Sequence, residues 1–299
     1  MYRSIIVGYD GSPQSEDAVA LGKLLAEATG ASLTLAGVFY FSPRLGGRDP
    51  VLQDIEAEHV RRLEETAASA GAQAKATAST SPARGLHALA EEAGADLVVV
   101  GSAHHGKAGQ VLAGSVGVSL MHGSPCSVAI APHGYADRAA DTIAEVTVGF
   151  DGSPESEVAL TDAVELARAS GAPLRVVTVA SPPPIVYTRG GGPDYSWHVL
   201  KDELKETMRP RLAAAVEAVP DDLRVESTLA EGEAEAALAE IAVQDGGLLM
   251  LGSRGYGPLR RVLLGSVSTA LVRSARCPVI VHPRPAKAQA PEPAKAATA

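Results

Sequence analysis

The chain has 299 residues, enough for about two domains of ~150 residues each. Its formal net charge of -9 argues against a broad basic surface of the kind that binds nucleic acid or anionic membranes. Two cysteines are too few for the disulfide framework of a secreted domain, and we find neither a signal peptide nor an apolar run of about 18 residues. We therefore expect a cytoplasmic protein with no nucleic-acid or membrane partner.

The first half of the chain alternates strand-like and helical stretches. Residues 5–7 form a short apolar run, and Ser12-Pro13 predicts a helix start, because serine caps free amides and proline is tolerated at the first helical position. Gly30 is a candidate for the left-handed end of that helix. Further strands are expected near residues 33–38, 74–78, 97–100 and 128–130.

The second half repeats the first. VGYDGSP around Asp10 returns as VGFDGSP around Asp151, and Gly171 repeats the helix-ending glycine. PCSVAIAP at residues 125–132 returns as RCPVIVHP at residues 276–283. Later strands of this half are expected near residues 174–179, 225–229, 248–251 and 279–281. Because the motifs keep their order, we expect a duplicated domain of about 140 residues.

Continuous apolar strands separated by helices are typical of a parallel sheet covered on both faces. We predict an α/β chain of two tandem domains, each a doubly wound, Rossmann-like sheet of five parallel strands. The connections at residues 40–50 and 181–197 have the length of lids or binding loops. The expected boundaries are residues 1–135 (first domain), 136–144 (linker), 145–285 (second domain) and 286–299 (disordered tail).

A glycine motif follows the fourth strand of the second half. It reads GSRG from Gly252 to Gly255, then nine residues, then Gly265-Ser266 at a helix start. Open α/β sheets bind ligands at the carboxyl ends of their strands, and a helix N-terminus offers free amides to phosphate. Asp151 is expected across the same crevice, where its carboxylate can accept bonds from ribose or adenine. Together these features predict a nucleotide site.

The first half carries a variant of this motif. GSAHHGKAGQ at residues 101–110 is close to the P-loop pattern G-x-x-x-x-G-K-[ST], but Ala108 stands where a hydroxyl should hold Mg²⁺. The second half has Pro258 at the position of Lys107, which leaves this lysine as a local phosphate contact at most. His104 replaces the second glycine, and its imidazole either binds phosphate or blocks the close approach of the ligand. We expect the second half to bind nucleotide more reliably.

These residues resemble the universal stress protein family over nearly the whole chain before the tail. The resemblance lies in the VGYDGS and VGFDGS openings, the G-x2-G-x9-G-[ST] signature and the CPVIV-like ends. It implies a sheet of strand order 3-2-1-4-5 in each half and ATP, with or without Mg²⁺, as the ligand. Family members pair through their last strands. The halves are therefore expected to form a pseudo-dimer, which can pair again as a homodimer.

The resemblance also implies the ligand-binding residues. In the second half these surround adenine, ribose and phosphates, with Arg254 as an additional charge: Asp151, Val179, Gly252, Arg254, Gly255, Gly265, Ser266 and Val267. In the first half the matching positions keep the same glycine interval: Asp10, Val38, Gly101, His104, Gly114, Ser115 and Val116. No catalytic residue and no metal ligand is implied.

Simpler interpretations compete for several of these residues. Asp10 and Asp151 could serve only to shape Asp-Gly turns, although the glycine motif opposite favours a ligand role. Cys126 and Cys277 precede apolar strands, which favours buried small side chains over redox sensors. Helix capping explains Ser12, and its match in the repeat, better than a hydrolase nucleophile does. The histidines of the first half have no recognised metal-ligand spacing, and the second half lacks them.

Three functions are compatible with this sequence. The first is an ATP-binding stress-response or signalling module, in which the bound nucleotide biases conformation or partner choice with little or no turnover. The second is an enzyme, either a slow ATPase or a nucleotide-transferring protein, although no general base is evident. The third is an interaction module that acts without nucleotide through a sheet-edge dimer surface.

Overall fold

In the computed structural model, residues 1–40, 50–103, 110–138, 141–181, 194–242, 246–253 and 265–283 are described. The first half contains β1 (Ser4–Gly8), α1 (Pro13–Thr29), β2 (Ser32–Tyr40), α2 (Pro50–Ser69), β3 (Gln73–Ser79), α3 (Pro82–Ala93), β4 (Leu97–Gly101), α4 (Ser115–Met121) and β5 (Ser127–Ala131). The second half contains β6 (Glu145–Gly149), α5 (Pro154–Ser170), β7 (Leu174–Ala180), α6 (Asp194–Glu217), β8 (Val225–Glu231), α7 (Ala234–Ile241), β9 (Gly247–Gly252), α8 (Ser266–Ser274) and β10 (Val279–His282). The predicted alternation of strands and helices is confirmed in both halves.

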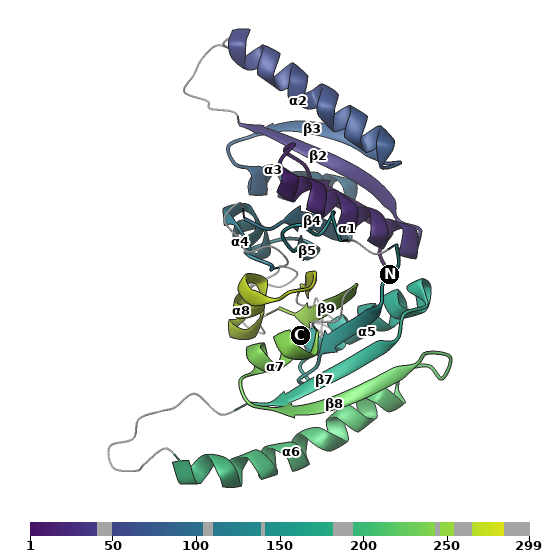
Figure 1. Ribbon diagram of the computed structural model, residues 1–299, viewed down its shortest axis with the longest axis vertical. Coiled ribbons are helices and arrows are strands. Elements are labelled where there is room, and N and C mark those ends of the chain that lie inside the picture. Colours follow the sequence, from purple (N-terminus) through teal and green to yellow (C-terminus); the bar gives the residue numbers. More distant parts are fainter. Residues whose placement is uncertain are drawn as a thin grey trace, which may run out of the picture.

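All ten strands form one sheet, in the order β3-β2-β1-β4-β5-β10-β9-β6-β7-β8 (Figure 1). Each half has the predicted order 3-2-1-4-5 with parallel neighbours, and the halves join where β5 pairs antiparallel with β10. Because the strand direction reverses at that junction, the carboxyl ends of the two sets of strands lie at opposite edges of the sheet.

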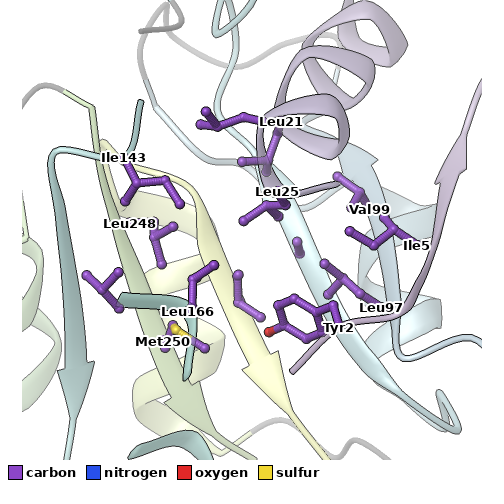
Figure 2. Close-up of a cluster of buried hydrophobic side chains, with 14 of the residues drawn as sticks. Tyr2, Ile5, Leu21, Leu25, Leu97, Val99, Ile143, Leu166, Leu248 and Met250 are labelled. Atoms are coloured by element: carbon purple, nitrogen blue, oxygen red, sulfur yellow. The ribbon is translucent and has the colours of Figure 1, made fainter. Parts of the chain in front are cut away.

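Two helical layers cover the sheet (Figure 1). Helices α1, α2, α5 and α6 pack on one face, and α3, α4, α7 and α8 pack on the other. The first layer continues across the junction, because Leu21 and Leu25 of α1 share a buried cluster with Leu166 of α5 and Leu248 of β9 (Figure 2). One apolar core therefore serves both halves on this face.

The helix ends are those that the sequence predicts. Ser12 and Ser153 cap α1 and α5 through their side chains, each with a proline at the first helical position. Gly30 and Gly171 end the same helices in left-handed backbone, with φ of 70° and 72°. The outermost strands β3 and β8 depart from the apolar pattern, because many of their side chains are exposed at the edges of the sheet.

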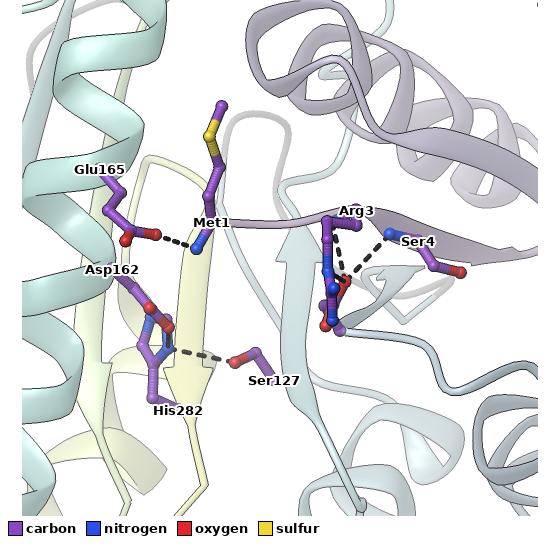
Figure 3. Close-up of polar contacts among 8 residues, drawn as sticks. Met1, Arg3, Ser4, Ser127, Asp162, Glu165 and His282 are labelled. Carbon is purple, nitrogen blue, oxygen red and sulfur yellow. Dashed lines mark hydrogen bonds and ion pairs between the residues drawn. The ribbon is translucent and has the colours of Figure 1, made fainter.

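Buried polar side chains mark the junction between the halves (Figure 3). His282 on β10 is fully buried, and its Nδ1 lies 2.8 Å from Asp162 Oδ2 of α5 and 3.1 Å from Ser127 Oγ of β5. The amino group of Met1 pairs with Glu165 of the same helix. Both the serine and the aspartate contact the same ring nitrogen, so these three residues do not have the geometry of a hydrolase triad.

The linker between the halves is anchored to α1. Both carboxylate oxygens of Asp17 accept backbone hydrogen bonds, from Gly134 N at 2.8 Å and from Ala136 N at 2.9 Å. Asp17 is only 3% exposed, so these two hydrogen bonds are shielded from water. Residues 139 and 140 of the linker and the whole segment 284–299, which includes the predicted tail, lie outside the described residues.

Candidate functional site

The larger candidate site is a cavity of about 990 Å³ at the carboxyl ends of the second-half strands. It is bounded by the ends of β6, β7 and β9, by the first turns of α5 and α8, and by side chains of α6 and α7. Six residues singled out from the sequence line it together: Asp151, Val179, Gly252, Gly265, Ser266 and Val267. Arg254 and Gly255 lie outside the described residues.

The first half has a matching cavity of about 300 Å³ at the opposite edge of the sheet. The corresponding predicted residues all line it: Asp10, Val38, Gly101, Gly114, Ser115 and Val116. His104 and Lys107 fall in residues 104–109, which the structure does not describe. Both halves thus gather the described members of the predicted set around one cavity each.

The start of α8 supplies hydrogen-bond donors to the larger cavity. The first bond inside this helix runs from Thr269 N to Gly265 O at 2.9 Å, so the amides of residues 266–268 precede any intrahelical bond. Gly265 N donates to Ser268 Oγ at 2.9 Å, which fixes the turn that leads into the helix. Free amides at the positive end of a helix favour an anionic ligand group such as phosphate.

The first glycine of each signature is required by packing. A Cβ at Gly101 would lie 1.9 Å from the backbone oxygen of Gln14, and one at Gly252 would lie 2.6 Å from the carbonyl carbon of Glu155. These glycines let the first turns of α1 and α5 approach the ends of β4 and β9. Gly114 has φ of -72°, which any residue can adopt, and an added Cβ would meet Ala103 at an ordinary 3.4 Å.

Asp151 shapes a turn and also borders the cavity. Its Oδ1 accepts a hydrogen bond from Ser153 N at 2.9 Å, and Asp10 Oδ1 accepts the matching bond from Ser12 N at 3.0 Å. Asp151 is exposed, and no described residue donates to its Oδ2. The turn interpretation and the ligand interpretation are therefore compatible, because each uses a different oxygen.

Several polar side chains that line the cavities were not predicted from the sequence. In the larger cavity, Ser253 Oγ and Ser181 Oγ are buried and have no hydrogen-bond partner among the described residues. Glu155, which also lines this cavity, is 4% exposed. In the smaller cavity Gln14 Oε1 is buried and unpaired, and Gln14 is 8% exposed. Ser253 follows a motif glycine directly, which was the available signal. Nothing in the local sequence distinguishes Gln14 or Glu155 from solvent-facing residues of a first helical turn.

Helix α8 also reaches the approach to the smaller cavity. Val111 N donates to Ala275 O, just past the end of α8, and Ala113 N donates to Val272 O of α8, both at 2.7 Å. Residue 113 is followed at once by Gly114, the cap of α4. The backbone that leads into the first site is thus held by the end of a helix whose start borders the second site.

Other candidate chemistries find no support among the described residues. Cys126 and Cys277 are free and buried, as predicted, and burial raises the pKa of their thiols to about 11 and about 12. The described part of the chain contains no cluster of three or more histidine, cysteine, aspartate or glutamate side chains that could hold a metal ion. Across that same part, every helix is too short or too polar to span a membrane.

Comparison with known proteins identifies relatives. The model of the universal stress protein family matches residues 1–132 and 143–283. A universal stress protein of Mycobacterium tuberculosis is 29% identical over 301 residues, which cover 94% of this chain and 99% of the relative.

Solved structures of the same family share the fold. A universal stress protein from Archaeoglobus fulgidus has a TM-score of 0.64 at 21% identity and covers 94% of this chain and 96% of its own. A universal stress protein in complex with cAMP matches 33% of this chain and 76% of its own at 28% identity, with a TM-score of 0.29. That match is too partial to carry a ligand over to this chain.

Proposed function

Because the chain belongs to the universal stress protein family, we propose that it is a cytoplasmic ATP-binding module that responds to stress or transmits a signal. Bound nucleotide biases its conformation or its choice of partner, with little or no turnover. The two domains correspond to residues 1–135 and 145–285, joined by a linker at residues 136–144.

One observation carries this proposal. The carboxylate of Asp151 and the free amides at the start of α8 border the same cavity, with Gly252 between them. A carboxylate oxygen suits the ribose hydroxyls or the adenine amino group, and the helix start suits the phosphates. Val179 and Leu238 add apolar surface against which a base can pack. This combination suits a nucleotide better than a purely apolar ligand.

The second half is the stronger site in this proposal. Its cavity is about 990 Å³, whereas the first half has adjoining cavities of about 300 Å³ and about 340 Å³ that share Asp10 and Val38, and α8 is longer than α4. The residues Asp151, Val179, Gly252, Gly265, Ser266 and Val267 would hold the ligand, with Arg254 and Gly255 as proposed additions from residues 254–264. The first half would use Asp10, Val38, Gly101, Gly114, Ser115 and Val116, with His104 as a proposed addition from residues 104–109.

Mg²⁺ fits the chemistry of the larger cavity. The carboxylates of Asp151 and Glu155 and the unpaired Ser253 Oγ line it, and these are the hard oxygen ligands that Mg²⁺ prefers. The ion would neutralise phosphate charge at these oxygens.

The antiparallel pairing of β5 with β10 supports a further part of the proposal, that the halves act as a pseudo-dimer. A homodimer of the whole chain would then bring two such pairs together.

Removal of one backbone N–H from the start of α8 tests the nucleotide site. Proline at position 266 removes the first free N–H of α8 but suits the first helical position, and Gly265 has the extended backbone (ψ of 175°) that a following proline needs. We expect Ser266→Pro to weaken ATP binding by about tenfold or more in calorimetric titration of the intact chain. Mass spectrometry of the ligand released from the native protein, and competition with ADP, AMP and cAMP, would name the nucleotide. Failure of every adenine nucleotide to bind, with partner capture retained, would support the nucleotide-independent interaction module instead.

A slow ATPase remains the second candidate, because two carboxylates, those of Asp151 and Glu155, line the same cavity as the proposed phosphate donors. A carboxylate within reach of a water molecule is a possible general base. Steady phosphate release that is abolished by Ser266→Pro, in a variant that still unfolds at the wild-type temperature, would favour the enzyme.

A further inference from the structure

The second cavity of the first half, about 340 Å³ in volume, lies on the face of the sheet that α2 covers (Figure 1). Gly37 and Phe39 of β2 point to this face, because Gly37 lies against Leu63 of α2 and side chains alternate along a strand. Val38 points to the opposite helical layer. The cavity meets the candidate nucleotide cavity only at the ends of β1 and β2, where three residues line both: Tyr9, Asp10 and Val38.

Ring side chains gather around this cavity. The whole chain has only three phenylalanines and seven tyrosines, yet Phe39 and Tyr9 line this one small volume together with His59. The ring centroids of Phe39 and His59 are 6.4 Å apart, and the two ring planes are 17° from parallel. The hydroxyl group of Tyr9 is 3.0 Å from both Glu16 Oε1 and Thr66 Oγ1, which fixes the position of its ring. Nearly parallel rings favour a flat aromatic ligand that stacks on their faces.

The charges around the cavity favour a cationic group on that ligand. Asp10 and Glu56 contribute carboxyl groups, and Glu56 is half-buried with no hydrogen bond or ion pair to another described residue. Arg62 contributes the opposing guanidinium, which lies across the turn at Gly11 and is 4.0 Å from Glu58, a residue outside the cavity lining. The charge of Arg62 is thus partly balanced from outside. A cation is attracted both by a carboxylate and by the faces of aromatic rings.

Helix α2 arranges these side chains in a row. Glu56, His59 and Arg62 are three residues apart, so each lies about 4.5 Å further along the helix axis than the one before. His59 therefore lies between the carboxylate and the guanidinium along the helix. A ligand ring placed against His59 can direct a cationic substituent toward Glu56 and away from Arg62.

The second half keeps the frame of this cavity but not its chemistry. Arg211 matches Arg62, since its Cδ would lie 3.4 Å from a Cβ at Gly152, as the Cδ of Arg62 would from a Cβ at Gly11. The stacked rings and the carboxylate are replaced: Ala180 stands for Phe39, Met208 for His59 and Lys205 for Glu56. The same fold thus forms without the rings and the carboxylate, which points to a ligand as their use in the first half.

We propose that this cavity is a separate binding site for a flat aromatic molecule that carries a protonated amine. The ring of the ligand stacks on Phe39 and His59, and its ammonium group pairs with the carboxylate of Glu56. The site lies on the opposite face of the sheet from α3 and α4, and its occupation requires no bound nucleotide.

Calorimetric titration of the intact chain with three probes tests the ligand class. Tryptamine has a flat ring and a protonated amine, indole-3-acetate has the same ring with a negative charge, and hexylamine has the amine without a ring. We expect tryptamine to bind with a Kd below about 1 mM and the other two to bind at least about tenfold more weakly. No binding of tryptamine at that concentration would overturn the proposal, as would equal binding of indole-3-acetate or hexylamine.

Variants that install the residues of the second half test the assigned side chains. Glu56→Lys should weaken tryptamine binding by at least about tenfold, and Phe39→Ala and His59→Met by about fivefold each. Glu56→Gln removes the charge with less change of shape and should weaken tryptamine binding in the same direction as Glu56→Lys.

Glu64→Lys is the matched control, since Glu64 is exposed on the same helix and does not line the cavity. It makes the same change of charge and should leave tryptamine binding unchanged, and thermal unfolding confirms that each variant is folded. Tryptamine binding that Glu56→Lys and Glu64→Lys weaken equally would overturn the proposal. ATP titration of His59→Met should match the wild type. A parallel loss of ATP binding would make this cavity part of the nucleotide site and would also overturn the proposal.

Discussion

The two halves of the molecule share a turn, a glycine interval and a strand order, yet their candidate sites are chemically different. The second half has one cavity of about 990 Å³ where the first has adjoining cavities of about 300 Å³ and about 340 Å³, and Glu155 stands where the first half has Gln14, both buried. The junction is unequal too, since its buried histidine and the half-buried aspartate that pairs with it both come from the second half. The two halves share a scaffold, while the side chains that line the candidate cavities and the junction differ.

The largest effect should come from the signature glycines that the two halves share. Gly101→Ala would place a methyl group 1.9 Å from a backbone oxygen, and we expect it to cost about 3 kcal/mol of folding free energy or more. Gly252→Ala, with its nearest backbone atom at 2.6 Å, should cost about 1–3 kcal/mol. Gly114→Ala is the control and should cost under about 1 kcal/mol. Chemical unfolding monitored by circular dichroism measures all three, and equal losses would contradict the packing explanation.

A smaller loss of folding free energy is expected at a contact that the first half alone makes with the chain leading into the linker. Asp17 accepts backbone hydrogen bonds from Gly134, just before the linker, and from Ala136 at its start, and Val158 occupies the position of Asp17 in the second half. Asp17→Ala leaves those amides unpaired and should destabilise the chain by about 2–3 kcal/mol. Asp17→Asn keeps one acceptor oxygen and should lose less. Hydrogen exchange at Gly134 and Ala136 should accelerate in both variants, and unchanged exchange would show that the linker is held by other contacts.

The smallest effect concerns the junction and depends on pH. Burial alone would raise the pKa of Asp162, but the hydrogen bond and charge of His282, with the N-terminal amino group, outweigh burial and lower it. A lowered carboxyl pKa stabilises the folded chain above the unfolded value of about 3.9, and this contribution is lost as the pH falls through the folded value. Leu21 occupies the matching position of α1, so only the second half contributes this pair.

We expect Asp162→Asn to be less stable than the wild type at pH 7, by about 1–2 kcal/mol. The difference should shrink as the pH falls below about 4. Thermal unfolding across this range measures it. If the stability difference between Asp162→Asn and the wild type stays constant with pH, the Asp162–His282 pair does not cause the loss of stability in acid.

Local signals in the sequence predicted the scaffold well. Serine caps, proline at the first helical position and left-handed glycines have physical causes within a few residues, and all of them are confirmed at α1 and α5. Periodic apolar runs located the strands. The glycine motif and the strand pattern alone pointed to Asp151, Gly252, Gly265 and Ser266. The order of the strands, and the addition of Val179 and Val267 to the site, came from the family resemblance.

The features that could not be predicted from the sequence depend on contacts between residues that lie far apart along the chain. Glu155 looks like a solvated residue of a helix start, and it is buried because Gly252, far along the chain, has no side chain to keep α5 away. Ser253 looks like Ser102, but only the latter finds a partner at residue 112. Such differences between repeats become visible only when the strands are placed side by side.

Helix α8 bears on whether the first half can keep its structure when it is separated from the second. It is about 14 Å long, and it runs from the candidate cavity of one half to the carbonyls that accept hydrogen bonds from Val111 and Ala113 of the other. A truncated first half would lose those acceptors and would also expose the edge of β5. An isolated first half is therefore not a smaller copy of the whole, because the backbone that leads into its cavity would lose two hydrogen-bond acceptors.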